Sequence, residues 1–210
     1  AIAIMDVSYL HYPEMFQKKD LLTLRGWTAY SARKAKRIFT ISKASKNDII
    51  KAYNVAEEKV VVTYPGIKPM ASLEPHIFDQ HTLRTRYGIT QEYILFVGTL
   101  QPRKNIERLI EAFSKLKSEK KDIQLVIVGK KGWLYEDILS APARYKVAER
   151  VKFLDFVPDD DLPSLYKHAS FFILPSLYEG FGLPVLEAMK YNCPVITSNV
   201  SSLPEAAGDA

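Results

Sequence analysis

Hydrophobic runs and amphipathic segments alternate along residues 91–210 of the chain. The runs are apolar throughout, as in parallel strands that are covered on both faces, and they span 93–97, 123–128, 151–156, 171–174 and 195–198. The segments between them repeat apolar side chains with the helical period, and they span 104–118, 133–148, 159–169 and 183–191. This alternation predicts a doubly wound, Rossmann-like parallel sheet, and hence an α/β fold.

The first third of the chain has a similar but shorter pattern. Apolar runs at 1–5, 37–41 and 60–63 predict three strands, while segments 20–36 and 44–53 predict two helices. Three strands and two helices are too few for a complete doubly wound domain. We therefore predict part of a second α/β domain.

Prolines and polar residues separate the two patterned parts of the chain. We predict a partial α/β domain over 1–66, a connector over 67–90 with one short helix from Leu83 to Tyr87, and a Rossmann-like domain over 91–210. The chain opens inside a predicted strand and stops shortly after the segment 203–209, where a helix should begin. We expect a fragment with missing segments at both ends.

Composition narrows the class of protein. Of the 210 residues, 47% are hydrophobic and 25% are charged, as in ordinary globular proteins. No apolar run approaches the ~20 residues of a membrane-spanning helix, and no signal peptide is recognisable. Cys193 is the only cysteine, so it cannot form an internal disulfide and fits a reducing compartment. We expect a cytoplasmic location and an inert buried thiol.

Positive charge is concentrated in the first third of the chain. Residues 1–63 hold 11 Lys/Arg and 6 Asp/Glu, whereas residues 64–210 hold 18 of each. The basic residues of the segment 18–37 have two interpretations. They are a solvated helix face, or they form a patch that contacts either the inner face of an anionic membrane or a phosphorylated acceptor. No recognition fold accompanies them, which disfavours nucleic acid. Trp27 and Trp133 are expected to serve packing.

The residues from Glu179 to Glu187 carry the most specific chemistry in the chain. The two glutamates flank a glycine turn, which follows the predicted strand at 171–174 and leads into a predicted helix. Gly180 and Gly182 let a ligand approach the backbone closely and leave a helix N-terminus to face an anion. This pattern suits a sugar nucleotide, because amides can bind phosphate while one acid binds the sugar and the other the ribose.

A second candidate site follows the predicted strand 93–97. Ligands bind at the carboxyl edge of open parallel sheets, and Gly98 permits a tight turn there. Arg103 and Lys104 stand where the next helix begins. A guanidinium fork and a point charge at this position can neutralise a pyrophosphate. A solvated basic turn is the alternative interpretation.

The run SLYEGFGLPVLEAMKYNCPVITSN, which begins at Ser176, resembles the E-x7-E signature of the retaining GT-B glycosyltransferases of family 4. The loop 98–105 is similar to the loop that grips the donor diphosphate in that family. The resemblance implies a GT-B fold, with 91–210 as the donor-binding part. Many members carry Arg directly after the glycine, where this chain has Thr99, so one phosphate contact is expected to be weaker.

The resemblance also implies roles for individual residues. Arg103 and Lys104 hold the diphosphate, Glu179 positions the donor sugar, and Asp6 completes the catalytic group. Glu187 accepts hydrogen bonds from the ribose. The other donor-binding residues are expected to act largely through their backbones, and they are Gly98, Thr99, Val157, Gly180, Phe181, Gly182 and Leu183. Among these, the family's Phe-Val-Pro segment around Val157 reads the base.

Two segments of the first third are similar to the same family. Residues 4–14 match a segment that faces the donor sugar, although Met5 stands where His is common. A thioether cannot donate a hydrogen bond, so either His11 or a missing residue compensates, or the donor sugar differs. The segment 41–48 is similar to a helix start of the family. We interpret its serines as N-cap residues rather than catalytic ones.

No metal or other cofactor is expected. Asp159, Asp160 and Asp161 could suggest a metal site, but acidic capping of a short helix explains them. The four histidines have no ligand spacing with one another. Members of the family usually need no metal, because a helix dipole and basic side chains replace the cation.

The implied activity is that of a glycosyltransferase that moves a hexose from a nucleotide-diphosphate sugar to an acceptor hydroxyl with retention. Mannose or glucose is expected from family frequency. The expected acceptor is a glycan or a lipid-linked molecule in polysaccharide or glycolipid synthesis. One alternative is a fragment that binds a nucleotide sugar without turning it over. Another is a GT-B nucleotide-sugar epimerase, which the loop 98–105 and the two-glutamate block disfavour.

Overall fold

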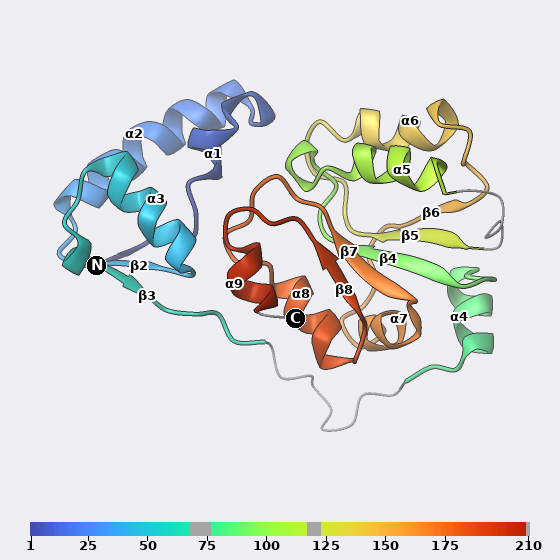
Figure 1. Cartoon of the computed structure of the whole chain (residues 1–210). Helices are drawn as coiled ribbons and strands as arrows, with labels where there is room; N and C mark the ends of the chain where they lie inside the picture. Colours follow the sequence, from blue (N-terminus) through green and yellow to red (C-terminus); the bar gives the residue numbers. More distant parts are fainter. Residues whose placement is uncertain (68–76, 117–122, 209–210) are drawn as a thin grey trace. The chain divides into compact units, whose positions relative to one another are not determined.

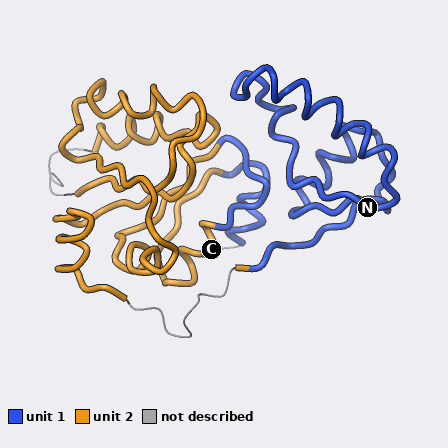
Figure 2. Tube along the Cα trace, turned by 180° about the vertical axis from the view of Figure 1, so that it is seen from behind, with its two compact units in different colours: residues 1–66, 177–183, 199–210 blue, residues 67–176, 184–198 orange. Residues whose placement is uncertain are grey.

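The structure is a computed structural model that describes residues 1–67, 77–116 and 123–208. It forms two compact units (Figure 2). The first unit comprises Ala1–Gly66, Leu177–Leu183 and Asn199–Ala210, and the second comprises Ile67–Ser176 and Pro184–Ser198. Two short segments from the predicted donor-binding part thus cluster with the first 66 residues. The predicted domain boundaries themselves stay a prediction.

The first unit contains a small parallel sheet of three strands in the order β1-β2-β3. The central strand is β2 (Ile38–Thr40), whose Ile38 lies opposite Ile2 on one side and Val60 on the other. The flanking strands are β1 (Ile2–Ala3) and β3 (Val60–Val62). The strands predicted from the three apolar runs are therefore confirmed, with shorter bounds.

Helices connect these strands (Figure 1). The two long helices, α2 (Lys18–Lys34) and α3 (Lys43–Tyr53), confirm the predicted ones. Shorter turns of helix, which the sequence pattern did not indicate, are α1 (Ser8–His11), η1 (Pro13–Met15) and η2 (Glu57–Lys59). The last helix, α9 (Leu203–Ala207), belongs to the first unit as well.

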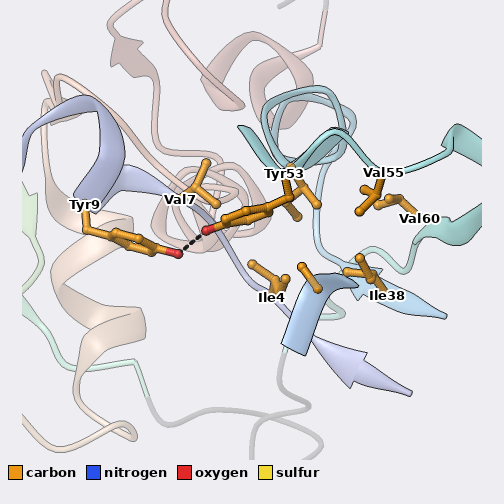
Figure 3. Packing of buried hydrophobic residues seen from close by; sticks show 9 residues of the cluster. Ile4, Val7, Tyr9, Ile38, Tyr53, Val55 and Val60 are labelled. Carbon is orange, nitrogen blue, oxygen red and sulfur yellow. Dashed lines mark hydrogen bonds between the residues drawn. The ribbon is translucent and has the colours of Figure 1, made fainter. Parts of the chain in front are cut away.

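The core of the first unit lies between α3 and the small sheet (Figure 3). Ile38 and Ile49 are completely buried in it. The hydroxyl groups of Tyr9 and Tyr53 form a hydrogen bond inside this cluster. This bond satisfies both phenols, which would otherwise be costly to bury.

The second unit is built on a five-stranded parallel sheet with the order β6-β5-β4-β7-β8. Its strands are β4 (Tyr93–Val97), β5 (Gln124–Val128), β6 (Val151–Leu154), β7 (Phe171–Leu174) and β8 (Val195–Thr197). The chain order reverses between β4 and β7, which is the topological switch point where ligands bind in sheets of this kind. The α/β prediction with a Rossmann-like parallel sheet is confirmed.

Helices of the second unit cover both faces of this sheet (Figure 1). Figure 1 places α5 (Ile106–Ser114) and α6 (Glu136–Arg144) together on one face, and α7 (Leu162–His168) on the other. The helix α4 (Gln80–Tyr87) confirms the short helix predicted within the connector. The helix α8 (Leu183–Lys190) follows β7.

Two sequence predictions about packing are wrong. The apolar stripe of 104–118 ends early, because α5 stops at Ser114 and Leu116 is 45% exposed. Trp27 does not serve packing, since it is 69% exposed on the surface of α2. Periodicity marked α2 as a helix, but it did not show which of its apolar side chains lack a partner.

Candidate active site

The loop after β4 is fixed at the carboxyl edge of the second unit's sheet. Asn105 takes a left-handed backbone conformation with φ 59° at the start of α5. Its side-chain amide donates a hydrogen bond of 3.1 Å to the carbonyl of Pro175, directly after β7. The loop is therefore tied across the switch point of the sheet, where a ligand is expected.

Lys104 is part of this loop and is buried, with a relative exposure of 9%. It lies in the short helix η3 (Pro102–Lys104) together with Arg103. Its Cε lies 3.7 Å from the position that a Cβ would take on Gly98. The ammonium stem thus packs over the turn that leaves β4. Gly98, Arg103 and Lys104 all lie in the loop between β4 and α5.

Gly129, which sequence reasoning missed, makes the close packing of this turn feasible. It directly follows β5, and a Cβ on it would lie only 2.0 Å from the carbonyl oxygen of Gly98. The amide of Gly98 donates a 2.9 Å hydrogen bond to Val128, next to it. Only glycine fits such an approach of two backbones. The one available signal was a glycine directly after a predicted strand.

Glu187 is held by a tyrosine. The hydroxyl of Tyr166, on α7, donates a 2.8 Å hydrogen bond to Glu187 Oε2 on α8. Tyr166 is 1% exposed, and burial, followed by the nearby charge of Glu187, raises its pKa well above the usual value. The ring of Tyr191 stacks on that of Tyr166 with centroids 6.2 Å apart. The carboxylate therefore has one defined orientation.

Glu179 lies in the segment 177–183 of the first unit, and its backbone is bonded on both sides. Its amide donates to Ser201 Oγ at 2.9 Å, while its carbonyl accepts from Ser202 Oγ at 2.9 Å. The side chain is buried. The next residue, Gly180, accepts a 3.3 Å hydrogen bond from Ser45 Oγ on α3. Hydrogen bonds to distant parts of the chain thus hold this glycine-rich turn in place.

Asp6 lies against the same turn within the first unit. Its Oδ2 is 3.1 Å from the position that a Cβ would take on Gly180, so a larger residue there would press on the carboxylate. Its Oδ1 accepts a 2.8 Å hydrogen bond from the amide of Ser8, the first residue of α1. The structure therefore places the Asp6 carboxylate beside Gly180, the residue that follows Glu179. Phe181 packs beside Tyr64, with ring centroids 5.8 Å apart.

His11, one of the residues expected to compensate for Met5, contacts Asp48 and Tyr178. Its Nε2 is 3.2 Å from Asp48 Oδ2, and its ring stacks on Tyr178 with centroids 5.1 Å apart. Met5 itself is 54% exposed. His11 thus contacts Tyr178, the residue that directly precedes Glu179.

The serines at the start of α3 have different roles. Ser42 is the N-cap, because its side chain accepts the amide of Ser45 at 2.9 Å. Ser45 instead donates its hydroxyl to Gly180. The N-cap interpretation is therefore confirmed for Ser42 and wrong for Ser45.

The capping interpretation of Asp161 holds for its position, which is the N-cap of α7, but not for its side chain. Asp161 precedes α7 but makes no side-chain capping bond. It is 4% exposed, and it accepts a hydrogen bond from Tyr87 and pairs with Arg86 Nη2 at 2.9 Å. Its carboxylate therefore joins α4 to α7. In the part of the chain that the structure describes, no group of three or more His, Cys, Asp or Glu side chains could hold a metal.

The predicted site residues fall into two sets, one in each unit. Asp6 and the residues from Glu179 to Leu183 belong to the first unit, whereas the second unit contains Gly98, Thr99, Arg103, Lys104, Val157 and Glu187. Thr99 is exposed, and Val157 is buried after β6. Among the described residues, no helix is long and apolar enough to span a membrane.

The solved structures similar to this chain include GT-B glycosyltransferases. A crystal structure of WaaG, a glycosyltransferase involved in lipopolysaccharide biosynthesis, matches 98% of this chain and 58% of its own, with a TM-score of 0.78 and 22% identity. The Anabaena protein HepE, crystallised with UDP and glucose, matches 97% of this chain and 54% of its own, with a TM-score of 0.76 and 23% identity. At these identities the likeness establishes the fold.

Residues 79–210 match the family model described as glycosyl transferases group 1. The O-antigen chain mannosyltransferase B of Escherichia coli is 36% identical over 219 aligned positions, which cover 98% of this chain and 54% of that protein. The chain belongs to the glycosyl transferases group 1 family. It spans about half the length of this curated relative.

Proposed function

We propose that this protein is a retaining glycosyltransferase of family 4 that moves a hexose from a nucleotide-diphosphate sugar to an acceptor hydroxyl. The observation that carries the proposal is the loop after β4, in which Asn105 is tied to Pro175 and Lys104 packs over Gly98. Basic side chains held in a fixed loop at the switch point of a parallel sheet suit a diphosphate.

In the proposed reaction, Arg103 and Lys104 bind the diphosphate and stabilise the charge that develops on it. Glu187 accepts hydrogen bonds from the ribose, and Val157 lies where the base is read. Thr99, which replaces the arginine common in the family, leaves more of the phosphate binding to Arg103. The proposed reaction uses no metal or other cofactor, since Arg103 and Lys104 supply the positive charge.

Glu179 positions the donor sugar together with the amides of Gly180, Phe181, Gly182 and Leu183. The contact of Asp6 with Gly180 supports its place in the same group. The acceptor oxygen attacks the anomeric carbon from the face that the phosphate leaves. A new glycosidic bond forms as the bond to phosphate breaks, and the acceptor's proton passes to the leaving phosphate. This route gives retention without a protein nucleophile.

The comparisons favour mannose as the sugar. A relative at 36% identity is an O-antigen chain mannosyltransferase, and a glycan or lipid-linked acceptor in polysaccharide synthesis would follow. HepE, whose structure holds UDP and glucose, supports a nucleotide-sugar donor but keeps glucose as the second choice. A binding fragment without turnover and a nucleotide-sugar epimerase are the alternatives. Hexose transfer that depends on an added acceptor distinguishes the enzyme from both.

We further propose that α2 contacts an anionic membrane from its cytoplasmic side. The segment 18–37 holds seven Lys/Arg and one acid. Its exposed face also carries large apolar side chains, since Leu22, Trp27 and Tyr30 are 76%, 69% and 58% exposed. These three residues line a shallow surface depression of about 730 Å³. Basic and aromatic side chains on one helix are typical of helices that lie at a lipid interface.

Thermal unfolding in the presence of GDP, UDP and ADP tests the donor site. At a ligand concentration ~100-fold above Kd, binding adds roughly 2.7 kcal/mol of stability, which raises the midpoint by about 2–4 °C per kcal/mol. We expect a shift with one nucleotide that is lost in Glu187→Ala and kept in Glu149→Ala, which removes an exposed acid of the same unit. A cooperative transition that no nucleotide shifts would refute the proposed donor site.

A further inference from the structure

One face of α3 bonds to the residues on both sides of Glu179. The hydroxyl of Tyr178 donates a 2.6 Å hydrogen bond to Asp48 Oδ2. Ser45, three residues before Asp48 and so on the same helix face, donates a 3.3 Å hydrogen bond to the carbonyl of Gly180. We call these four residues, Ser45, Asp48, Tyr178 and Gly180, the α3 clamp. All of them lie in the first unit.

The Tyr178–Asp48 bond is the stronger part of the clamp. It joins a phenol to a carboxylate, and charge-assisted bonds are roughly twice as strong as neutral ones. Tyr178 is 5% exposed, and burial, followed by its hydrogen bond to Asp48, raises its pKa above the usual value. The phenol therefore stays protonated and keeps donating. His11 adds to the carboxylate a second contact, at 3.2 Å, and stacks on the Tyr178 ring.

The clamp restricts the backbone of a segment that is rich in glycine. Glu179 is followed by glycines at 180 and 182, and glycines leave a turn with many backbone conformations. A side chain that must meet a sugar in one geometry binds it better when the ordering is completed before the ligand arrives. Ser201 and Ser202 fix the backbone of Glu179 itself, and the clamp fixes its two neighbours.

We propose that Asp48, acting through Tyr178, is a positioning residue for Glu179 in recognition of the donor sugar. This inference rests on the proposed function. It assigns Tyr178 and Asp48 to the sugar part of the donor and not to the nucleotide, which is assigned to Arg103, Lys104 and Glu187. Loss of the clamp should therefore weaken binding of a nucleotide sugar and leave binding of the free nucleotide unchanged.

Calorimetric titration with the pairs GDP and GDP-mannose, and UDP and UDP-glucose, tests this assignment. We expect Tyr178→Phe and Asp48→Ala each to raise the Kd for the nucleotide sugar about tenfold, the loss of one hydrogen bond to a charged group. The Kd for the free nucleotide should stay within about twofold in either variant. Because both substitutions remove the same bond, the double variant should be no weaker than the worse single one.

Tyr53→Phe is the matched control. It also removes a buried tyrosine hydroxyl from the first unit, where Tyr53 bonds to Tyr9 inside the hydrophobic cluster (Figure 3). It should lower stability but leave both Kd values unchanged. A general loss of stability would therefore act equally in the control and in the clamp variants.

Amide hydrogen exchange gives a second readout. Tyr178→Phe should speed exchange in the segment 177–183 about tenfold, and Tyr53→Phe should not. Clamp variants that bind nucleotide sugar as wild type does, or that lose nucleotide and nucleotide sugar equally, would overturn the assignment. A wild-type protein that binds none of the four probes would instead refute the proposed donor-binding function, and the sugar role of the clamp with it.

Discussion

The phenol of Tyr166 donates a 2.8 Å hydrogen bond to Glu187 Oε2 from a position that is 1% exposed. Glu187 is the acid that we assign to the ribose of the donor. Its orientation thus depends on a tyrosine from a different helix, 21 residues earlier in the chain.

We expect Tyr166→Phe to weaken nucleotide binding about tenfold, because the carboxylate loses the donor that orients it. Isothermal titration with the nucleotide that stabilises the wild type measures this. Tyr93→Phe is the control, since Tyr93 also buries its hydroxyl in the second unit and donates it to the carbonyl of Leu165 at 2.7 Å. A Tyr166→Phe variant with wild-type affinity would show that Glu187 does not need its tyrosine.

Gly129→Ala should destabilise the second unit by about 1–3 kcal/mol, as overpacking does. The added Cβ would meet the backbone oxygen of Gly98 at 2.0 Å, and backbone cannot turn away as a side chain can. Urea unfolding measures the change. Gly26→Ala in α2 is the matched control, because a Cβ there would meet no atom within 4 Å. It should leave stability unchanged or raise it, since alanine is up to about 1 kcal/mol more favourable than glycine in a helix interior. Equal midpoints for the two variants would contradict the prediction.

Arg33→Glu should weaken binding to vesicles that contain anionic phospholipid. Adding Trp27→Ala to this variant should weaken the binding further. Each basic residue near an anionic surface contributes about 1 kcal/mol, which is roughly a fivefold change in partitioning. Co-sedimentation with anionic and with neutral vesicles measures both effects. Lys51→Glu makes the same charge change at an exposed position on α3 and should have little effect. Equal binding of wild type to neutral and anionic vesicles would rule out the proposed contact.

The thiol of Cys193 should react slowly in the folded protein. Burial raises its pKa from 9.0 to about 11, and the thiolate is the reactive form. Alkylation by iodoacetamide at pH 8 should be at least about tenfold slower than in urea. Fast alkylation of the folded protein at pH 8 would contradict the buried position.

The same shift has a consequence for stability at high pH. The fold favours the protonated thiol, so this contribution is complete below pH 9.0 and is lost as the pH rises towards about 11. Tyr87 behaves similarly, since burial and its bond to Asp161 raise its pKa from 10.0 to about 12. Cys193→Ala should therefore lose less stability than wild type between pH 9 and pH 11, and equal losses would contradict the shift.

Hydrophobic periodicity by itself determined the eight strands of the described residues and the long helices that connect them. It could do so because strands and helices depend on neighbours within a few positions, and the pattern of apolar residues records those neighbours directly. The basic loop at 103–104 and the two glutamates were also recognisable, since their chemistry lies in short motifs.

Only the tertiary structure decided what surrounds these residues. Tyr166 orients Glu187 from another helix, Ser45 meets Gly180 from 135 positions away, and Gly129 makes room for Gly98 across two strands. Trp27 was expected inside and is exposed. Such contacts depend on how distant segments pack, and hydrogen bonds between them leave no periodic signal in the chain. The sequence therefore determined the elements and the chemical groups, while the packing of distant segments determined their orientation.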